Sequence, residues 1–212
     1  MTRNNADFQG KLPHQMSPEE FASSPASVFH GTFLPDEKVL DVGIREPASA
    51  SGAQVPAVKK MHLGTFQAAL DAVHERNRQP DQKATIHTFW QTPRVNRIGG
   101  KMPELADPNP EDEAHFKSGA MYYANQNEDW GNPSFATETP KKHLKTQAEY
   151  VSDALAQGKE SEVHPRTLEQ YRKGTLGKMQ LNPSQVELMI TSRDKLGPLR
   201  NAGPQWDYLR GK

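Results

Sequence analysis

Apolar and polar residues follow two different spacings along this chain. In its N-terminal and middle parts, short runs alternate apolar and polar positions, which is the period of a β-strand with one face in a core. The pattern predicts strands at residues 28–33, 58–63, 84–90, 121–124 and 134–137, with a further short strand at 39–42. The strands are short and separated by turn-rich segments, so we expect a small, mainly antiparallel sheet.

Helical spacing is clearest directly after the second predicted strand. Phe66 and Val73 share one face of a helix over residues 66–77, and Gln67 and Asp71 are predicted to face solvent. Thr65 precedes this helix and can cap its N-terminus. The segment therefore predicts a strand followed at once by an amphipathic helix.

Two other helices are marked by their first residues. Ser17 with Glu20, and Asn182 with Gln185, have the spacing of a capping box, and in both a proline follows the capping residue. We expect a short helix after Ser17, a helix near residues 109–118, and three helices at 147–156, 166–173 and 186–193. The chain is thus predicted to be α+β, with its helices concentrated toward the C-terminus.

The composition indicates a limited core. Only 34% of the 212 residues are hydrophobic, the mean hydropathy is −0.85, and there are 17 prolines and 15 glycines. Much of such a chain is expected to be irregular. We predict an N-terminal arm with a short helix at 1–26, a core at 27–139, a helical C-terminal region at 140–197 and a C-terminal tail at 198–212.

Charge and cysteine content narrow the function classes. The 26 basic and 26 acidic residues balance, which gives no electrostatic indication of nucleic acid or of an anionic membrane. The absence of cysteine excludes disulfides, thiolate nucleophiles and cysteine-based zinc sites. The histidines lack a recognisable metal-ligand spacing, no phosphate-binding glycine loop is found, and no run is apolar enough to span a membrane. We expect a soluble protein without a metal.

One repeated pattern carries candidate chemistry. His30-Gly31-Thr32 lies on the first predicted strand, and His62-x-Gly64-Thr65 lies on the next, just before the amphipathic helix. An acidic segment with aromatic residues follows near the end of the core. This combination resembles the ADP-ribosyltransferase fold, in which two small split antiparallel sheets hold NAD in the cleft between them.

The resemblance implies roles for individual residues. His30, Gly31 and Thr32 would contact NAD from the first strand, and His62 and Tyr123 would complete the cofactor site. A glycine beside the histidine would let a ligand approach the backbone closely.

The same resemblance calls for a carboxylate beside the scissile bond. Glu128 is the acid it implies, with Glu138 in reserve, because loss of nicotinamide develops positive charge on the ribose. The alternative for His30 and His62 is that they are hydrogen-bonded core histidines. Tyr123 has the corresponding alternative of a core aromatic.

A second resemblance concerns origin. The runs 29–32 and 62–71, with Tyr-x-Asn-x-x-Glu-Asp-x-Gly-x-x-Ser-Phe over 123–135, are similar to uncharacterised proteins of tailed bacteriophages, often encoded among virion structural genes. This implies a structural or accessory protein of the head or connector region. Its partners would be portal, capsid or connector subunits, and it would reside in the virion, or in the host cytoplasm during assembly. The alternative is an NAD-dependent mono-ADP-ribosyltransferase that modifies a host protein.

Overall fold

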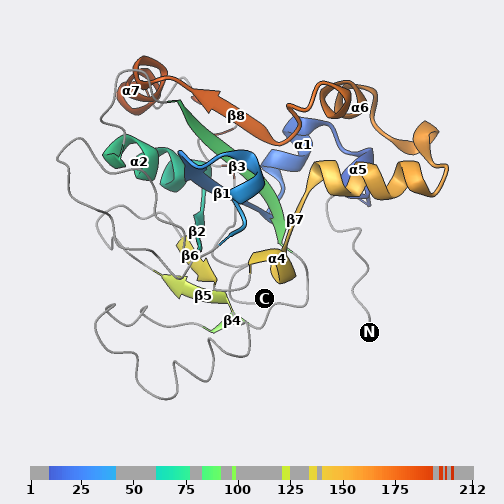
Figure 1. The fold of residues 1–212 in the computed structure, drawn as a ribbon, viewed down its shortest axis with the longest axis horizontal. Coiled ribbons are helices and arrows are strands. Elements are labelled where there is room, and N and C mark those ends of the chain that lie inside the picture. The colour runs from blue at the N-terminus through green and yellow to red at the C-terminus, as the bar shows by residue number, and fades with distance from the viewer. Residues whose placement is uncertain are drawn as a thin grey trace.

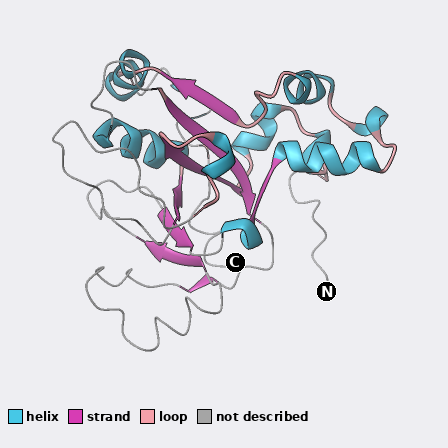
Figure 2. Ribbon diagram, in the orientation of Figure 1, coloured by secondary structure: helices cyan, strands magenta, loops and turns pink. Residues whose placement is uncertain are grey.

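A computed structural model of the chain describes residues 10–41, 61–76, 83–91, 97–98, 121–124, 134–137, 140–192, 196–197, 199 and 202. These residues form an α+β fold in which helices flank one open, mainly antiparallel sheet (Figures 1 and 2). The predicted fold class is therefore confirmed at this level. None of the described helices is both long and apolar enough to cross a bilayer.

The strands pair in the order β4-β5-β6-β2-β1-β3-β7, and β8 pairs with β3 beside β7. Their bounds are β1 Ser27–Thr32, β2 Met61–Gly64, β3 Ala84–Gln91, β4 Arg97–Ile98, β5 Met121–Ala124, β6 Ser134–Thr137, β7 Leu144–Thr146 and β8 Lys178–Leu181. Only the β4–β5 pair is parallel among these strands. Five of the six predicted strands thus form, displaced by no more than three residues at either end.

The sheet is narrowest between β1 and β2. These two strands share a single register pair, Phe29 with Gly64, whereas β1 and β3 share six pairs. The sheet consequently has one half built from β2, β4, β5 and β6 and another built from β1, β3, β7 and β8.

Strand β3 lies at the centre of the second half. Its first seven residues, Ala84–Trp90, are all buried. One edge of β3 pairs with β1, and the other edge pairs with β8 over residues 84–87 and with β7 over residues 89–91. Between those two ladders, the Thr88 N–H donates to the Gly177 carbonyl at 2.9 Å. Strands β7 and β8 both come from residues 140–197, the region that we predicted to be only helical.

The two faces of this half-sheet are covered differently. On one face α2 (Phe66–Arg76) and α7 (Pro183–Thr191) pack beside each other over β1 and β3, as Figure 1 shows. Their core includes Phe29, Phe66 and Ile86. The opposite face carries a smaller cluster around Val28 and Phe89.

The helices begin where their capping residues predict. α1 (Pro18–Ser23) is capped by Ser17 and Glu20, and α7 is capped by Asn182 and Gln185, each pair with both reciprocal hydrogen bonds. α5 spans Gln147–Ala156 and α6 spans Pro165–Arg172, and a short helix, α4, spans Pro140–His143. Single 3-10 turns lie at η1 Pro13–Gln15, η2 Asp36–Lys38 and η3 Glu160–Glu162. The helix predicted at 109–118 lies outside the described residues.

Both terminal segments pack on the same chain. Met16 and Phe21 are buried against Trp90 of β3, and the segment that holds them lies along α5. Toward the other end, Leu196 and Ala202 join the core under α2, and the Phe66 N–H donates to the Ala202 carbonyl at 3.0 Å. Residues 10–26 and the described part of 196–202 are therefore integral to the fold.

Two predictions from the sequence are wrong. Residues 36–41, where a strand was expected from Val39, form the η2 turn and a following turn instead. Gln67 and Asp71 were predicted to face solvent, but both are buried, with the Gln67 amide donating to Asp71 at 2.9 Å. A helical wheel identifies the face that packs on the sheet, but it does not show whether another segment covers the remaining faces.

Candidate functional site

The His-Gly-Thr sequence lies on β1 as predicted. His30 is opposite His87 of β3, and Thr32 is opposite Thr85, so these four residues share one face of the sheet. His30 is half-buried, and the other three are buried. The Thr32 hydroxyl accepts the Leu34 N–H at 3.1 Å, which fixes the chain as it leaves the strand.

Gly31 belongs to the other face and meets helix α2. A Cβ at this position would lie 2.4 Å from the Ala69 carbonyl oxygen and 2.5 Å from Cγ1 of Val73. Both distances are far inside van der Waals contact, and one of the atoms is backbone that cannot rotate away. Helix α2 thus lies directly against the backbone of Gly31, in the place where the sequence suggested a ligand.

His30, His87 and Lys178 form a polar row across the sheet, and His87 is its central residue. It is opposite His30 on one side and opposite Lys178 of β8 on the other. Asp36 of η2 lies above the row, with one carboxylate oxygen 2.6 Å from the Lys178 ammonium and the other 3.6 Å from Nε2 of His87. The row therefore joins β1, β3, β8 and η2 through charged and polar groups.

Burial dominates the electrostatics of His87. Only 3% of its surface is exposed. Burial is the largest cause of a lowered pKa at His87; Asp36 opposes this shift, Lys178 adds to it, and the net pKa is about 4. The imidazole is consequently neutral at pH 7. It stacks on Phe89, with ring centroids 6.0 Å apart.

This arrangement suits hydrogen bonding more than proton transfer. A general base acts best when its pKa is near the working pH, and His87 is far below it. The Lys178 charge is already balanced by Asp36. The row can orient a polar group against the sheet, but its described residues contain no activated nucleophile. Nor do the described residues include three His, Asp or Glu side chains placed to hold a metal ion.

The other predicted site residues are placed by backbone register or lie outside the described part. His62 of β2 is opposite Ala136, and Tyr123 of β5 is opposite Phe135. Since Gly64 is paired with Phe29, strand alternation assigns position 62 to the face of Phe29, whereas position 30 belongs to the other. Glu128 and Glu138 lie outside the described residues.

Sequence reasoning missed the other members of the polar row that contains His30. His87 was assigned to a strand without a role, and Asp36 and Lys178 were assigned to a loop and to the C-terminal region. One signal was present in the sequence, because a histidine inside a buried strand needs a polar neighbour. The pairing of His87 with Lys178, however, depends on β8, a strand that the sequence did not predict.

The fold and the site define an α+β protein with an open antiparallel sheet and a polar row on one face. Comparison of the chain with models of known protein families, with curated proteins and with solved structures finds no match in any of the three.

Proposed function

We propose that the chain is a structural or accessory protein of a tailed-phage virion, built on an ADP-ribosyltransferase-like core. It docks on portal, capsid or connector subunits through residues at its two ends. The proposal combines the sequence resemblance with the way in which the chain uses its His-Gly-Thr sequence.

Two features support the likeness of the core. His30, Gly31 and Thr32 lie on β1 in the middle of the sheet, and the sheet narrows to one residue pair between β1 and β2. A narrow join of this kind corresponds to the split between two small sheets that the resemblance implies. The likeness concerns architecture and does not by itself carry an activity.

The single observation that favours a structural role is the packing at Gly31. The glycine that would admit a ligand instead admits the backbone of α2, at a distance that leaves no room for a methyl group. Beside it, His87 is buried and neutral. The His-Gly-Thr sequence, on which the resemblance rests, thus holds helix α2 against the sheet.

The segments available for docking are narrower than the predicted arms. Residues 10–26 and the described part of 196–202 pack on their own chain, so removing them would damage the fold. We therefore assign docking to residues 1–9 and 203–212.

Deletion of residues 1–9, or of residues 203–212, is expected to reduce incorporation into particles while the unfolding temperature stays unchanged. The measurement is the amount of chain in purified particles when the variant replaces the parent protein during infection. A matched control replaces each segment with a Gly/Ser sequence of equal length. Normal incorporation of both deletions would contradict docking through the ends.

A second function, transfer of ADP-ribose from NAD to a host protein, is favoured by one observation. His30 and Thr32, which the resemblance assigns to NAD, share a face with the polar row of His87 and Lys178. Incubation with labelled NAD and host lysate tests it, with Glu128→Gln as the control variant. Under the structural proposal we expect no label transfer and no NAD hydrolysis. Transfer that is lost in Glu128→Gln would establish the enzyme instead.

A further inference from the structure

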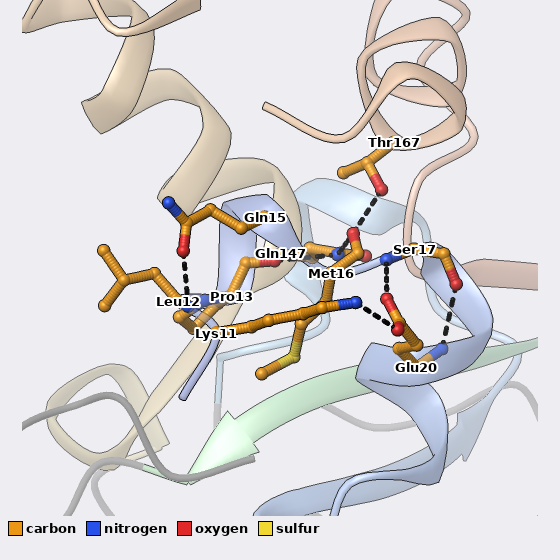
Figure 3. A network of polar contacts seen from close by, with 9 residues as sticks. All are labelled: Lys11, Leu12, Pro13, Gln15, Met16, Ser17, Glu20, Gln147 and Thr167. Atoms are coloured by element: carbon orange, nitrogen blue, oxygen red, sulfur yellow. Dashed lines mark hydrogen bonds and ion pairs between the residues drawn. The ribbon is translucent and has the colours of Figure 1, made fainter. Parts of the chain in front are cut away.

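Residues 11–23, here called the strap, form a unit with its own internal bonds (Figure 3). The Lys11 ammonium pairs with Glu20, and Glu20 accepts the Ser17 N–H at 2.8 Å. The Glu20 N–H donates in turn to the Ser17 hydroxyl at 3.1 Å, and the Leu12 N–H donates to the Gln15 side chain at 2.9 Å. These bonds would persist wherever the strap moved as a whole.

The strap is held by a clamp made of α5, the N-terminal end of α6 and Trp90. Gln147 of α5 donates from its amide to the carbonyls of Pro13 and Met16, at 2.9 and 3.1 Å. The Thr167 hydroxyl of α6 donates to the same Met16 carbonyl at 2.6 Å. All three bonds end on main-chain oxygens of the strap.

Further contacts continue this pattern. The His164 N–H donates to the His14 carbonyl at 3.0 Å. Arg166 pairs with Glu19 at 2.8 Å on the surface. Most of the polar contacts between clamp and strap thus use backbone atoms, which any copy of the strap presents identically.

Apolar contact supplies the rest of the attachment. Met16 and Phe21 are buried, and the Phe21 ring lies 5.3 Å from the ring of Trp90 between centroids. The Tyr150 ring of α5 lies edge-on to Trp90, with ring centroids 6.5 Å apart. The clamp is therefore a site for a short peptide with two buried apolar side chains, and the chain's own strap occupies it.

A three-residue linker, residues 24–26, joins the strap to β1. The linker closes in a tight turn, in which the Ser27 N–H donates to the Ser24 carbonyl at 3.0 Å and Pro25 occupies the first central position. The strap returns to its own clamp only through this turn. Short, constrained linkers of this kind favour exchange of an element between copies.

We propose that two copies of this chain exchange straps, so that the strap of each occupies the clamp of the other. The occupant is a second copy of the chain because the clamp is already complementary to these residues. The contacts between strap and clamp are the same as those within one chain, so the dimer keeps them and closes with two-fold symmetry. The exchange requires opening of the turn at residues 24–27, which breaks the main-chain hydrogen bond between Ser27 and Ser24 and the hydrogen bond from the Ser27 hydroxyl to the Phe21 carbonyl. This inference does not depend on a role in a virion.

Changes in the linker test the exchange in opposite directions. Deletion of Pro25 removes the turn, so the strap can reach only a partner, and we expect a folded dimer at every concentration measured. Insertion of Gly-Ser-Gly after Pro25 relaxes the turn, and we expect dimerisation about tenfold weaker than in the wild type, the effect of roughly one hydrogen-bonded turn. Pro25→Ala preserves the length and is the matched control. Light scattering after size exclusion gives the oligomeric state, and a folded monomer after deletion of Pro25 would overturn the proposal.

A complementation experiment identifies the exchanged element. One full-length variant carries a damaged strap, Met16→Asp, and the other carries a damaged clamp, Gln147→Ala with Thr167→Val. When the two are co-expressed with different tags, the intact strap of the second can occupy the intact clamp of the first, and we expect a mixed dimer. Each variant expressed alone is expected to give no dimer. Absence of the mixed dimer, with both variants present in the soluble fraction, would refute strap exchange.

Discussion

Gly31→Ala is expected to destabilise the protein by about 3 kcal/mol or more, because the added methyl group overlaps the backbone of α2. The overlap involves the Ala69 carbonyl oxygen at 2.4 Å and Cγ1 of Val73 at 2.5 Å. Val73 could change rotamer, but the carbonyl moves only if the whole helix shifts away from β1. Urea denaturation followed by circular dichroism measures the loss.

Two comparisons make this result informative. Gly158→Ala introduces a methyl group into open space at a positive φ of 72°, and should cost only about 1 kcal/mol. Val73→Ala in the Gly31→Ala protein should restore only part of the stability, because the carbonyl contact remains. If Gly31→Ala is as stable as the wild type, α2 does not require this glycine, and a ligand becomes the better explanation of it.

Acidification is expected to destabilise the protein through His87. The folded state keeps this imidazole neutral down to about pH 4, whereas an unfolded histidine takes up a proton near its ordinary pKa of 6.5. The unfolded state therefore binds more protons between these values. Stability from His87 is complete above about pH 6.5 and is lost as the pH falls to about 4. The whole interval corresponds to about 3 kcal/mol, from the 1.36 kcal/mol that each pKa unit represents.

The measurement is a difference between two proteins. Carboxylates and other histidines also titrate in this range, so denaturation of the wild type alone cannot isolate His87. His87→Gln keeps a polar side chain of similar size without a titrating group, and its free energy of unfolding should fall less between pH 7 and pH 4. Equal losses in the two proteins would mean that His87 is protonated in the folded state as readily as in the unfolded one.

The elements that the sequence predicted well are those with local causes. Ser17 with Glu20 and Asn182 with Gln185 satisfy the first N–H groups of their helices from within a few residues. The helix of residues 147–156 was predicted with its observed bounds from its amphipathic spacing, and the structure adds a capping box of the same kind between Thr146 and Glu149. Such signals do not depend on the rest of the fold.

The elements that the sequence missed depend on distant partners. β8 contains Lys178 and Gln180, and β7 has only three residues, so neither resembles a strand on its own. Both form because β3 offers an unpaired edge. For the same reason the polar row was only half predicted. His30 was identified by its motif, but Asp36 and Lys178 reach His87 only after the sheet is assembled.

The shared edge of β3 also bears on how the chain is made. While the ribosome is extending the chain, β3 can pair with β1 early, but its other edge stays open until residues up to Leu181 have emerged. An open edge on a strand that is buried in the finished fold is a site for pairing with other nascent chains. Productive synthesis is thus expected to depend on protection of this strand until translation is nearly finished, and fragments that end before β8 are expected to aggregate.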